Sequence, residues 1–202
     1  LMRDKVDVYD IGSNIISRSV PLQNTRDRDA ESLLNGEHPE RLWYSFGITN
    51  PGSLTLNNYP NFLRNLSIPL VGNIDLATID VLRDRERGVP RYNEFRREIG
   101  LNPITKFEDL TTDPATLANL KRIYGNDIEK IDTLVGMLAE TVRPDGFAFG
   151  ETAFQIFIMN ASRRLMTDRF YTKDYRPEIY TAEGLAWVEN TTMVDVLKRH
   201  NP

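Results

Sequence analysis

Two phenylalanines, an alanine and an arginine recur along one segment of the chain at the spacing of an α-helix. They are Phe154, Phe157, Ala161 and Arg164, and successive members lie three, four and three residues apart, so they share one helix face. This order suits an amphipathic acid, because the rings can line its apolar tail while the guanidinium pairs with its carboxylate. The alternative is structural: the aromatic stripe belongs to a core, and Arg164 is a snorkelling cation near the helix C-terminus.

A second candidate lies in a segment dense in charge. Between Val81 and Gly100 there are six arginines and four acids. Charge counts alone favour a solvated surface with ion pairs, each of which contributes little to stability. The order of the residues is more specific, since Asn73 or Asp75 can cap a helix that runs to about Arg87, Gly88 can end it and Pro90 prevents its continuation. The segment therefore predicts two helices joined by a tight turn.

The elements that must position these residues are predicted to be helices. Hydrophobic residues recur at helical spacing from Pro60 onward, and period-two alternation is nearly absent. We therefore predict an all-α protein, with residues 58–202 as its helical part. Further helices are predicted from Pro114 to Gly125, along the stripe Ile128, Ile131, Leu134, Val135 and Leu138, from Glu151 to Arg169, and after the caps Thr181 and Thr192.

Residues 1–57 carry weaker helical patterns. Asn, Gly, Ser and Asp recur there, and Pro21, Pro39 and Pro51 interrupt any long helix. We predict a long irregular, loop-rich segment with one or two short helices, one of them around Glu40–Phe46.

Composition excludes several classes of protein. The 202 residues are 40% hydrophobic with a net charge of -4, which supports a core but gives no basis for a nucleic-acid or anionic-membrane partner. There are no cysteines, which excludes disulfides and thiolate metal sites. No signal peptide and no transmembrane segment are visible in this chain. We expect a cytoplasmic or membrane-peripheral location.

The charged segment resembles the signature of the animal haem peroxidase superfamily. There a helix of the form D-L-x-x-x-x-x-x-R-x-R-x-x-G leads into P-x-Y-N-x-x-R. The matching residues are Asp75, Leu76, Arg83, Arg85, Gly88, Pro90, Tyr92, Asn93 and Arg96. The resemblance implies the C-terminal helical portion of an animal haem peroxidase-like fold, with haem as the cofactor. It also favours a structural role for Arg83 and Arg85, which would tie the two helices together.

The same resemblance gives a role to Asp80. In these peroxidases a polar residue at the matching position hydrogen-bonds the free nitrogen of the proximal haem histidine. A carboxylate there would fix the tautomer of the imidazole and increase its electron donation to iron. The alternative for Asp80 is an exposed acid on a helix.

The segment from Glu151 to Phe170 is similar to a block of the plant fatty-acid α-dioxygenases, E-T-A-F-x-I-F-x-x-x-A-S-R-R-L-x-x-D-R-F. The resemblance implies that Arg164 binds the fatty-acid carboxylate and that Phe154 and Phe157 line the tail channel. Gln155 and Asn160 replace apolar residues of that block, and we expect them to face away from the channel.

The chain has two histidines, His38 and His200, and neither has the context of the family's proximal histidine. Leu1-Met2-Arg3-Asp4 resembles the segment that follows that ligand, so we expect the axial ligand upstream of Leu1. The catalytic tyrosine and the distal histidine are expected there too, which leaves no catalytic residue and no metal ligand in this chain. The resemblance also allows a calcium site in that missing N-terminal part.

These observations predict part of a haem-dependent oxygenase that adds dioxygen at the α-carbon of fatty acids. Its partners would be a fatty acid or other small-molecule substrate and the missing N-terminal part of the same protein, and this chain alone would be inactive. Two alternatives stay open: a haem peroxidase that uses hydrogen peroxide on other small donors, and a helical scaffold without chemistry of its own.

Overall fold

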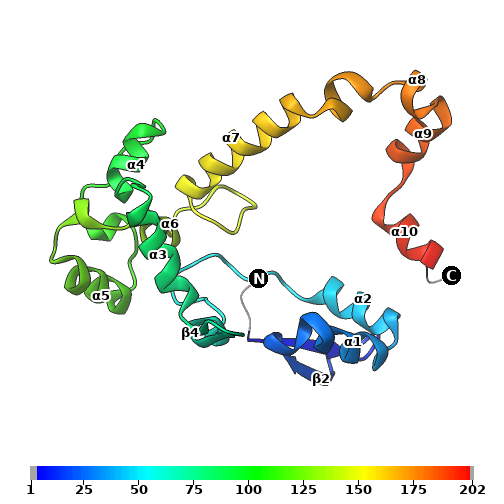
Figure 1. Cartoon of the computed structure of the whole chain (residues 1–202), viewed down its shortest axis with the longest axis horizontal. Coiled ribbons are helices and arrows are strands. Elements are labelled where there is room, and N and C mark those ends of the chain that lie inside the picture. Colours follow the sequence, from blue (N-terminus) through cyan, green and yellow to red (C-terminus); the bar gives the residue numbers. More distant parts are fainter. Residues whose placement is uncertain (1–3, 201–202) are drawn as a thin grey trace. The chain divides into compact units, whose positions relative to one another are not determined.

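The computed structural model describes residues 4–200, apart from the side chain of Asp27. Helices dominate these residues, as predicted, and the strands form two small hairpins (Figure 1). The chain divides into two compact units, Leu1–Phe154 and Gln155–Pro202. Leu1, Met2 and Arg3, which belong to the segment expected to follow an axial ligand, lie outside the described residues.

The first unit begins with a hairpin and two helices. β1 (Lys5–Tyr9) pairs antiparallel with β2 (Ile16–Pro21), and η1 (Leu22–Thr25), α1 (Asp27–Asn35) and α2 (Pro39–Ile48) follow. Their shared core consists of Val8, Val20, Leu33 and Leu42. The two short helices match the prediction, but the hairpin makes residues 1–57 more regular than expected. Each strand buries one side chain, Val8 or Val20, which leaves no alternating pattern long enough to recognise.

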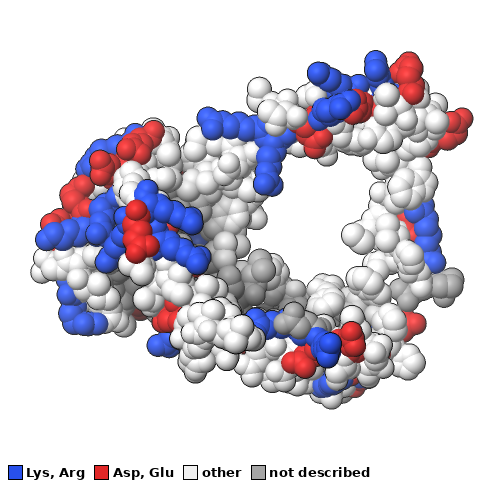
Figure 2. Space-filling view, in the orientation of Figure 1, with Lys and Arg blue, Asp and Glu red and all other residues white. Residues whose placement is uncertain are grey.

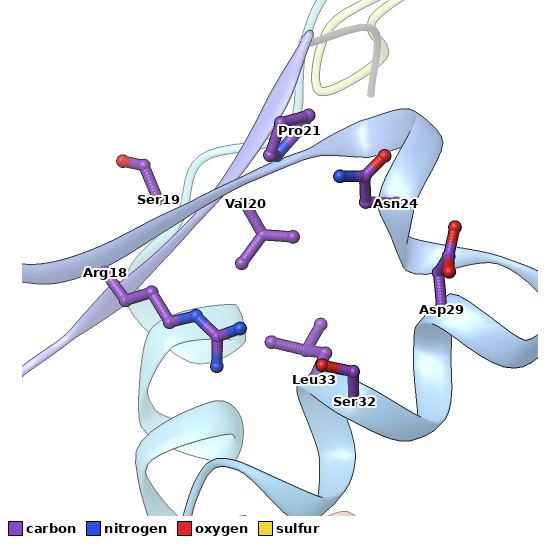
Figure 3. Close-up of a pocket in the computed structure, with 8 residues that line it drawn as sticks. All are labelled: Arg18, Ser19, Val20, Pro21, Asn24, Asp29, Ser32 and Leu33. Carbon is purple, nitrogen blue, oxygen red and sulfur yellow. The ribbon is translucent and has the colours of Figure 1, made fainter.

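A cavity of about 240 Å³ lies between β2, η1 and α1 (Figure 3). Asn24, Asp29 and Ser32 bring polar groups to it, and Val20 and Leu33 contribute its apolar side. Arg18 also lines it, and its guanidinium lies 3.7 Å from a carboxylate oxygen of Glu37. No residue selected from the sequence for chemistry lines this cavity.

The remainder of the first unit is a helical assembly. Its elements are η2 (Asn61–Asn65), β3 (Leu66–Ile68), β4 (Gly72–Ile74), α3 (Leu76–Glu86), α4 (Tyr92–Glu98), η3 (Phe107–Asp109), α5 (Pro114–Tyr124), η4 (Ile128–Lys130) and α6 (Thr133–Ala139). Local signals placed several helix ends correctly. Asp75 accepts from the Thr78 backbone N–H at 3.2 Å, Asp113 caps α5, and Gly125 ends α5 at φ 65°.

The apolar stripe from Ile128 to Leu138 was predicted to be one helix, and this prediction is wrong. The chain forms η4, becomes extended at Ile131 (ψ 131°), and restarts as α6 after Asp132. The carbonyl of Ile131 accepts from the Tyr92 backbone N–H at 2.9 Å. The break therefore follows from contacts with α4, which a local pattern does not contain.

Close contact between α4 and α6 organises the core of this assembly. The buried core residues are Tyr92, Phe107, Leu110, Leu120, Tyr124, Ile131 and Ala139. Gly136 of α6 lies directly against the Tyr92 ring, where an added Cβ would come within 2.2 Å of Cδ2. Only glycine therefore allows the two helices to approach this closely.

The second unit contains most of one long helix and the short helices that follow it. α7 (Glu151–Thr167) begins in the first unit, and η5 (Phe170–Asp174), α8 (Pro177–Tyr180), α9 (Ala182–Asn190) and α10 (Met193–His200) follow. Thr181 accepts from the Gly184 backbone N–H at 3.1 Å, and Thr192 accepts from the Asp195 N–H at 3.3 Å, as their predicted capping roles require. Among residues 4–200, no helix combines the length and the apolar character needed to cross a membrane.

Candidate functional site

Asp132 is a buried carboxylate on which three helices of the first unit converge. Arg85 at the end of α3 donates to it from Nε at 2.8 Å and from Nη2 at 2.7 Å. Arg91, just before α4, also donates to it, and the Tyr124 hydroxyl at the end of α5 does so at 2.9 Å. Arg85 thus has a structural contact, and it links α3 to the start of α6. Arg83 is exposed in the last turn of α3.

These contacts shift two pKa values in opposite directions. Burial raises the pKa of Asp132, but the hydrogen bonds from Arg85 and Tyr124 and the charges of Arg91 and Arg85 together outweigh burial and leave it below its usual 3.8. Burial and the hydrogen bond to Asp132 raise the pKa of Tyr124 to about 12. The Asp132 contribution to stability is therefore complete above pH 3.8 and is lost as the pH falls through the lowered folded value. The Tyr124 contribution is complete below pH 10.0 and is lost as the pH rises toward about 12.

We expect Asp132→Asn to lower the free energy of unfolding at neutral pH by about 1–3 kcal/mol, since it weakens hydrogen bonds to a charged group. It should also reduce the pH dependence of that free energy below the usual carboxyl pKa. Urea unfolding of both proteins from pH 2.5 to 7 measures the two effects. Parallel pH profiles would contradict the role given to Asp132.

A second buried carboxylate, Glu140, connects α4, α6 and α7. It accepts from the Tyr92 hydroxyl, from Arg96 Nη1 at 3.3 Å and from the Thr152 backbone N–H at 3.0 Å. Arg96 also donates to the Thr152 hydroxyl and to Glu151, each at 2.7 Å. Burial and the negative charge of Glu140 raise the pKa of Tyr92, so its phenol stays protonated.

Asp80 lies on α3 at the edge of an apolar cavity of about 320 Å³. The cavity is lined by Leu54, Thr55, Leu56, Asn57, Asn58, Tyr59, Ala77, Asp80, Val81, Leu134, Val135 and Leu138. Asp80 is half-buried, which differs from the fully exposed acid of the alternative reading. Burial and the charges of Asp80 and Asp75 raise the pKa of Tyr59. A mostly apolar cavity with one carboxylate fits an apolar group together with an N–H donor that can pair with that carboxylate.

Figure 2 shows the Lys and Arg side chains interleaved with acids over the part of the first unit that contains α3 and α4. Arg97 pairs with Glu129 at 2.9 Å, with about half of each side chain exposed. Much of the charge in this segment is thus the ion-paired surface that charge counts alone indicate.

Three of the four residues selected on α7 line one concave surface in the second unit. Phe157, Ala161 and Arg164 lie there together with Asn160 and Leu165. Phe157 is 51% exposed, so it is not a core residue of this unit. The expectation that Asn160 faces away from this surface is wrong. Asn160 follows Phe157 by three residues and precedes Arg164 by four, which places it at the margin of their face.

Phe154, the fourth residue, lies in the first turn of α7 and packs in the first unit. Its ring centroid is 4.5 Å from that of Phe147 and 6.2 Å from that of Phe149. Gln155 is half-buried. Spacing along the helix predicted the shared face, but it did not indicate these aromatic neighbours from the preceding loop.

His38 and His200 are both exposed at helix ends. His38 precedes α2 as its N-cap residue, and His200 is the last residue of α10. Within residues 4–200, no three His, Cys, Asp or Glu side chains are grouped so that they could hold a metal ion.

Sequence reasoning missed the contacts of Glu140 with Arg96 and Thr152. Tyr92 and Arg96 are part of the motif P-x-Y-N-x-x-R, and the motif does not indicate which residues they contact. Glu140 directly follows the apolar run Leu-Val-Gly-Met-Leu-Ala. An acid at the end of such a run could have indicated a buried carboxylate, which requires a charged or hydrogen-bonding partner.

A curated protein and two crystal structures of a second protein show what this chain is similar to. Alpha-dioxygenase 2 of Arabidopsis thaliana is 44% identical over 194 residues, which cover 93% of this chain and 31% of that protein. The crystal structure of Oryza sativa fatty acid alpha-dioxygenase has a TM-score of 0.89 at 42% identity and covers 100% of this chain, which corresponds to 35% of that chain. A crystal structure of a variant of that enzyme with palmitic acid has a TM-score of 0.89 at 40% identity, again over 100% of this chain and 35% of that chain.

This chain spans about a third of the length of the relatives it matches. The family model described as animal haem peroxidase matches residues 1–202. The helical structure agrees with that match, as does the motif whose Arg85, Tyr92 and Arg96 hold the first unit together. The chain therefore belongs to the animal haem peroxidase family.

Proposed function

We propose that this chain is part of a haem-dependent oxygenase that adds dioxygen at the α-carbon of fatty acids, and that α7 anchors the substrate carboxylate. The observation that carries the proposal is the concave surface of α7, where Phe157, Ala161 and Arg164 lie together. The similarity to fatty acid alpha-dioxygenases, one of them with palmitic acid, supports it.

In this proposal Arg164 binds the carboxylate, and Phe154 and Phe157 contact the tail. A guanidinium can donate two parallel hydrogen bonds to the two oxygens of a carboxylate, which fixes both position and orientation. The α-carbon is bonded to that carboxylate, so fixing the head group also fixes the carbon that reacts. The Asn160 amide on the same surface can donate a further hydrogen bond to a carboxylate oxygen.

Haem, when bound, supplies the oxidising chemistry that side chains lack. We propose that Asp80 accepts a hydrogen bond from the histidine that ligates haem, since it is the carboxylate of a mostly apolar cavity. The relatives are about three times as long, and the axial ligand and any calcium site are proposed to belong to the part of the family fold that this chain does not cover. That part is also the proposed partner of this chain.

Asp80→Asn is expected to raise the reduction potential of the haem. An amide is a weaker hydrogen-bond acceptor than a carboxylate, so the imidazole would donate less electron density to iron. The amide still accepts a hydrogen bond, so activity should fall by about tenfold, the lower end of what changes to such partners cause. Spectroelectrochemical titration of the haem-loaded protein measures the potential, with Asp84→Asn on the same helix as the matched control. An unchanged potential in Asp80→Asn would remove Asp80 from the haem site.

The function itself is tested with haem-loaded protein in which this chain is joined to its proposed N-terminal partner, using hexadecanoic acid and isotopically labelled dioxygen. The expected product is a 2-hydroperoxide that carries both labelled oxygen atoms. If no such product forms, and small phenolic donors are oxidised only when hydrogen peroxide is added, the protein is a peroxidase and the proposal is wrong.

A further inference from the structure

The N-terminus of α7 is capped by a residue of another element. The first backbone N–H groups of a helix have no partner within the helix, and a carboxylate is a favourable partner for them. Here Glu140, which follows α6 and is twelve residues away in sequence, accepts from the Thr152 N–H at 3.0 Å. Gly150 makes the approach possible, since a Cβ there would lie 2.2 Å from Oε2 of Glu140.

The Thr152 side chain links this cap to α4. Its hydroxyl donates to Glu140 and accepts from Arg96 Nη1 at 2.7 Å. Thr152 is fully buried, and 7% of Glu140 and 6% of Arg96 are exposed. Burial disfavours the charge on Arg96, but its hydrogen bond to Glu151 and the negative charges around it together outweigh burial and raise its pKa. The four side chains of Glu140, Arg96, Thr152 and Tyr92 are called the α7 clamp below.

The α7 clamp acts on the same helical turn that carries Phe154. The Phe154 N–H donates to the Gly150 carbonyl at 2.9 Å, and its ring packs against Phe147. Rotation of the first turn about the helix axis would break the contacts of Thr152 with Glu140 and Arg96 and would also turn the Phe154 ring. The direction of that ring is therefore coupled to the clamp.

We propose that Glu140 and Arg96 are positioning residues that set the rotation of the first turn of α7 and thereby the face that Phe154 presents to the acyl tail of the substrate. This inference rests on the proposed function, because it takes Phe154 as a tail contact. Neither residue touches the substrate; both act through Thr152.

The test compares Thr152→Val, which removes the bridging hydroxyl, with Thr152→Ser, which keeps it. The ratio of the dissociation constants for dodecanoic and hexadecanoic acid is measured by calorimetry on the haem-loaded protein. In Thr152→Val the preference for the longer acid is expected to fall about fourfold for each methylene that loses its contact. Thr152→Ser should retain the wild-type ratio. Glu140→Gln should shift the ratio in the same direction as Thr152→Val.

Asp132→Asn is the matched control for a purely structural role. Asp132 is a buried carboxylate with several donors in the same unit, but its partners Arg85, Arg91 and Tyr124 lie outside α7. The Asp132→Asn variant should lower stability without changing the ratio of the two dissociation constants. Hydrogen exchange at residues 151–155 provides a second measurement, and exchange there should rise in Thr152→Val and not in Asp132→Asn.

An unchanged ratio in Thr152→Val, or an equal shift in Asp132→Asn, would overturn the positioning role. A wild-type protein that binds neither acid overturns it as well. A wild-type protein that binds both acids with the expected ratios but does not oxygenate them refutes the proposed function and leaves the positioning role supported.

Discussion

Replacing Arg164 with alanine is expected to raise the KM for hexadecanoic acid about tenfold to a hundredfold, because hydrogen bonds between charged groups contribute roughly 1.5–3 kcal/mol. The methyl ester of the same acid should be used equally well by both proteins, since it offers no carboxylate. Steady-state oxygen uptake gives the KM for the acid and for the ester, and the ratio of the two KM values should change in Arg164→Ala. The KM of Arg164→Lys for hexadecanoic acid should lie between those of the wild type and Arg164→Ala, because lysine keeps the charge but cannot donate two parallel hydrogen bonds.

Arg163→Ala is the matched control, because it removes the same charge from the adjacent residue. Successive residues of a helix point about 100° apart, and Arg163 does not line the concave surface that holds Arg164. The control should keep the wild-type KM. A similar increase in both variants would mean that net charge, and not a specific contact, attracts the acid.

Replacing Gly136 with alanine is expected to destabilise the first unit by about 3 kcal/mol, at the upper end of what overpacking costs. The new methyl group would lie 2.2 Å from Cδ2 and 2.3 Å from Cγ of Tyr92. The ring cannot turn away, because Tyr92 is fully buried and its hydroxyl donates to Glu140. For a chain of this length the melting temperature should fall by about 6–12 °C, as calorimetry can measure.

Gly47→Ala provides the comparison for Gly136→Ala. Gly47 is also within a helix, α2, but a Cβ there would meet nothing within 4 Å. Alanine has the higher helix propensity, so this variant should be more stable by about 0.5–1 kcal/mol. A loss of stability equal to that of Gly136→Ala would show that the Tyr92 contact is not the cause.

Local signals predicted the helices well wherever a helix end depends on nearby residues. Asp75, Asp113 and Thr181 cap helices as their side chains allow, and Gly125 ends α5 in the left-handed conformation that glycine favours. The break at Ile131 was missed because its cause is the hydrogen bond to Tyr92, thirty-nine residues earlier in the chain. Contacts between residues so far apart in the chain produce no periodic pattern in the local sequence.

The candidate site also contains features that local spacing predicts and features that depend on contacts between distant segments. The face shared by Phe157, Ala161 and Arg164 follows from helical spacing alone. The cavity beside Asp80 required the segment Leu54–Tyr59 to fold against α3 and α6, and that segment has no pattern of its own. The expectation for Asn160 is wrong because this residue, three after Phe157 and four before Arg164, lies at the margin of their face.

The cap that Glu140 provides also has a consequence for the order of folding. Starting a helix is costly, because several residues must be ordered before the first hydrogen bond forms. The cap at the start of α7 is complete only when Glu140, which follows α6, and Arg96 of α4 are both in contact with Thr152. We therefore expect the first turn of this long helix to form only after α4 and α6 have packed against each other.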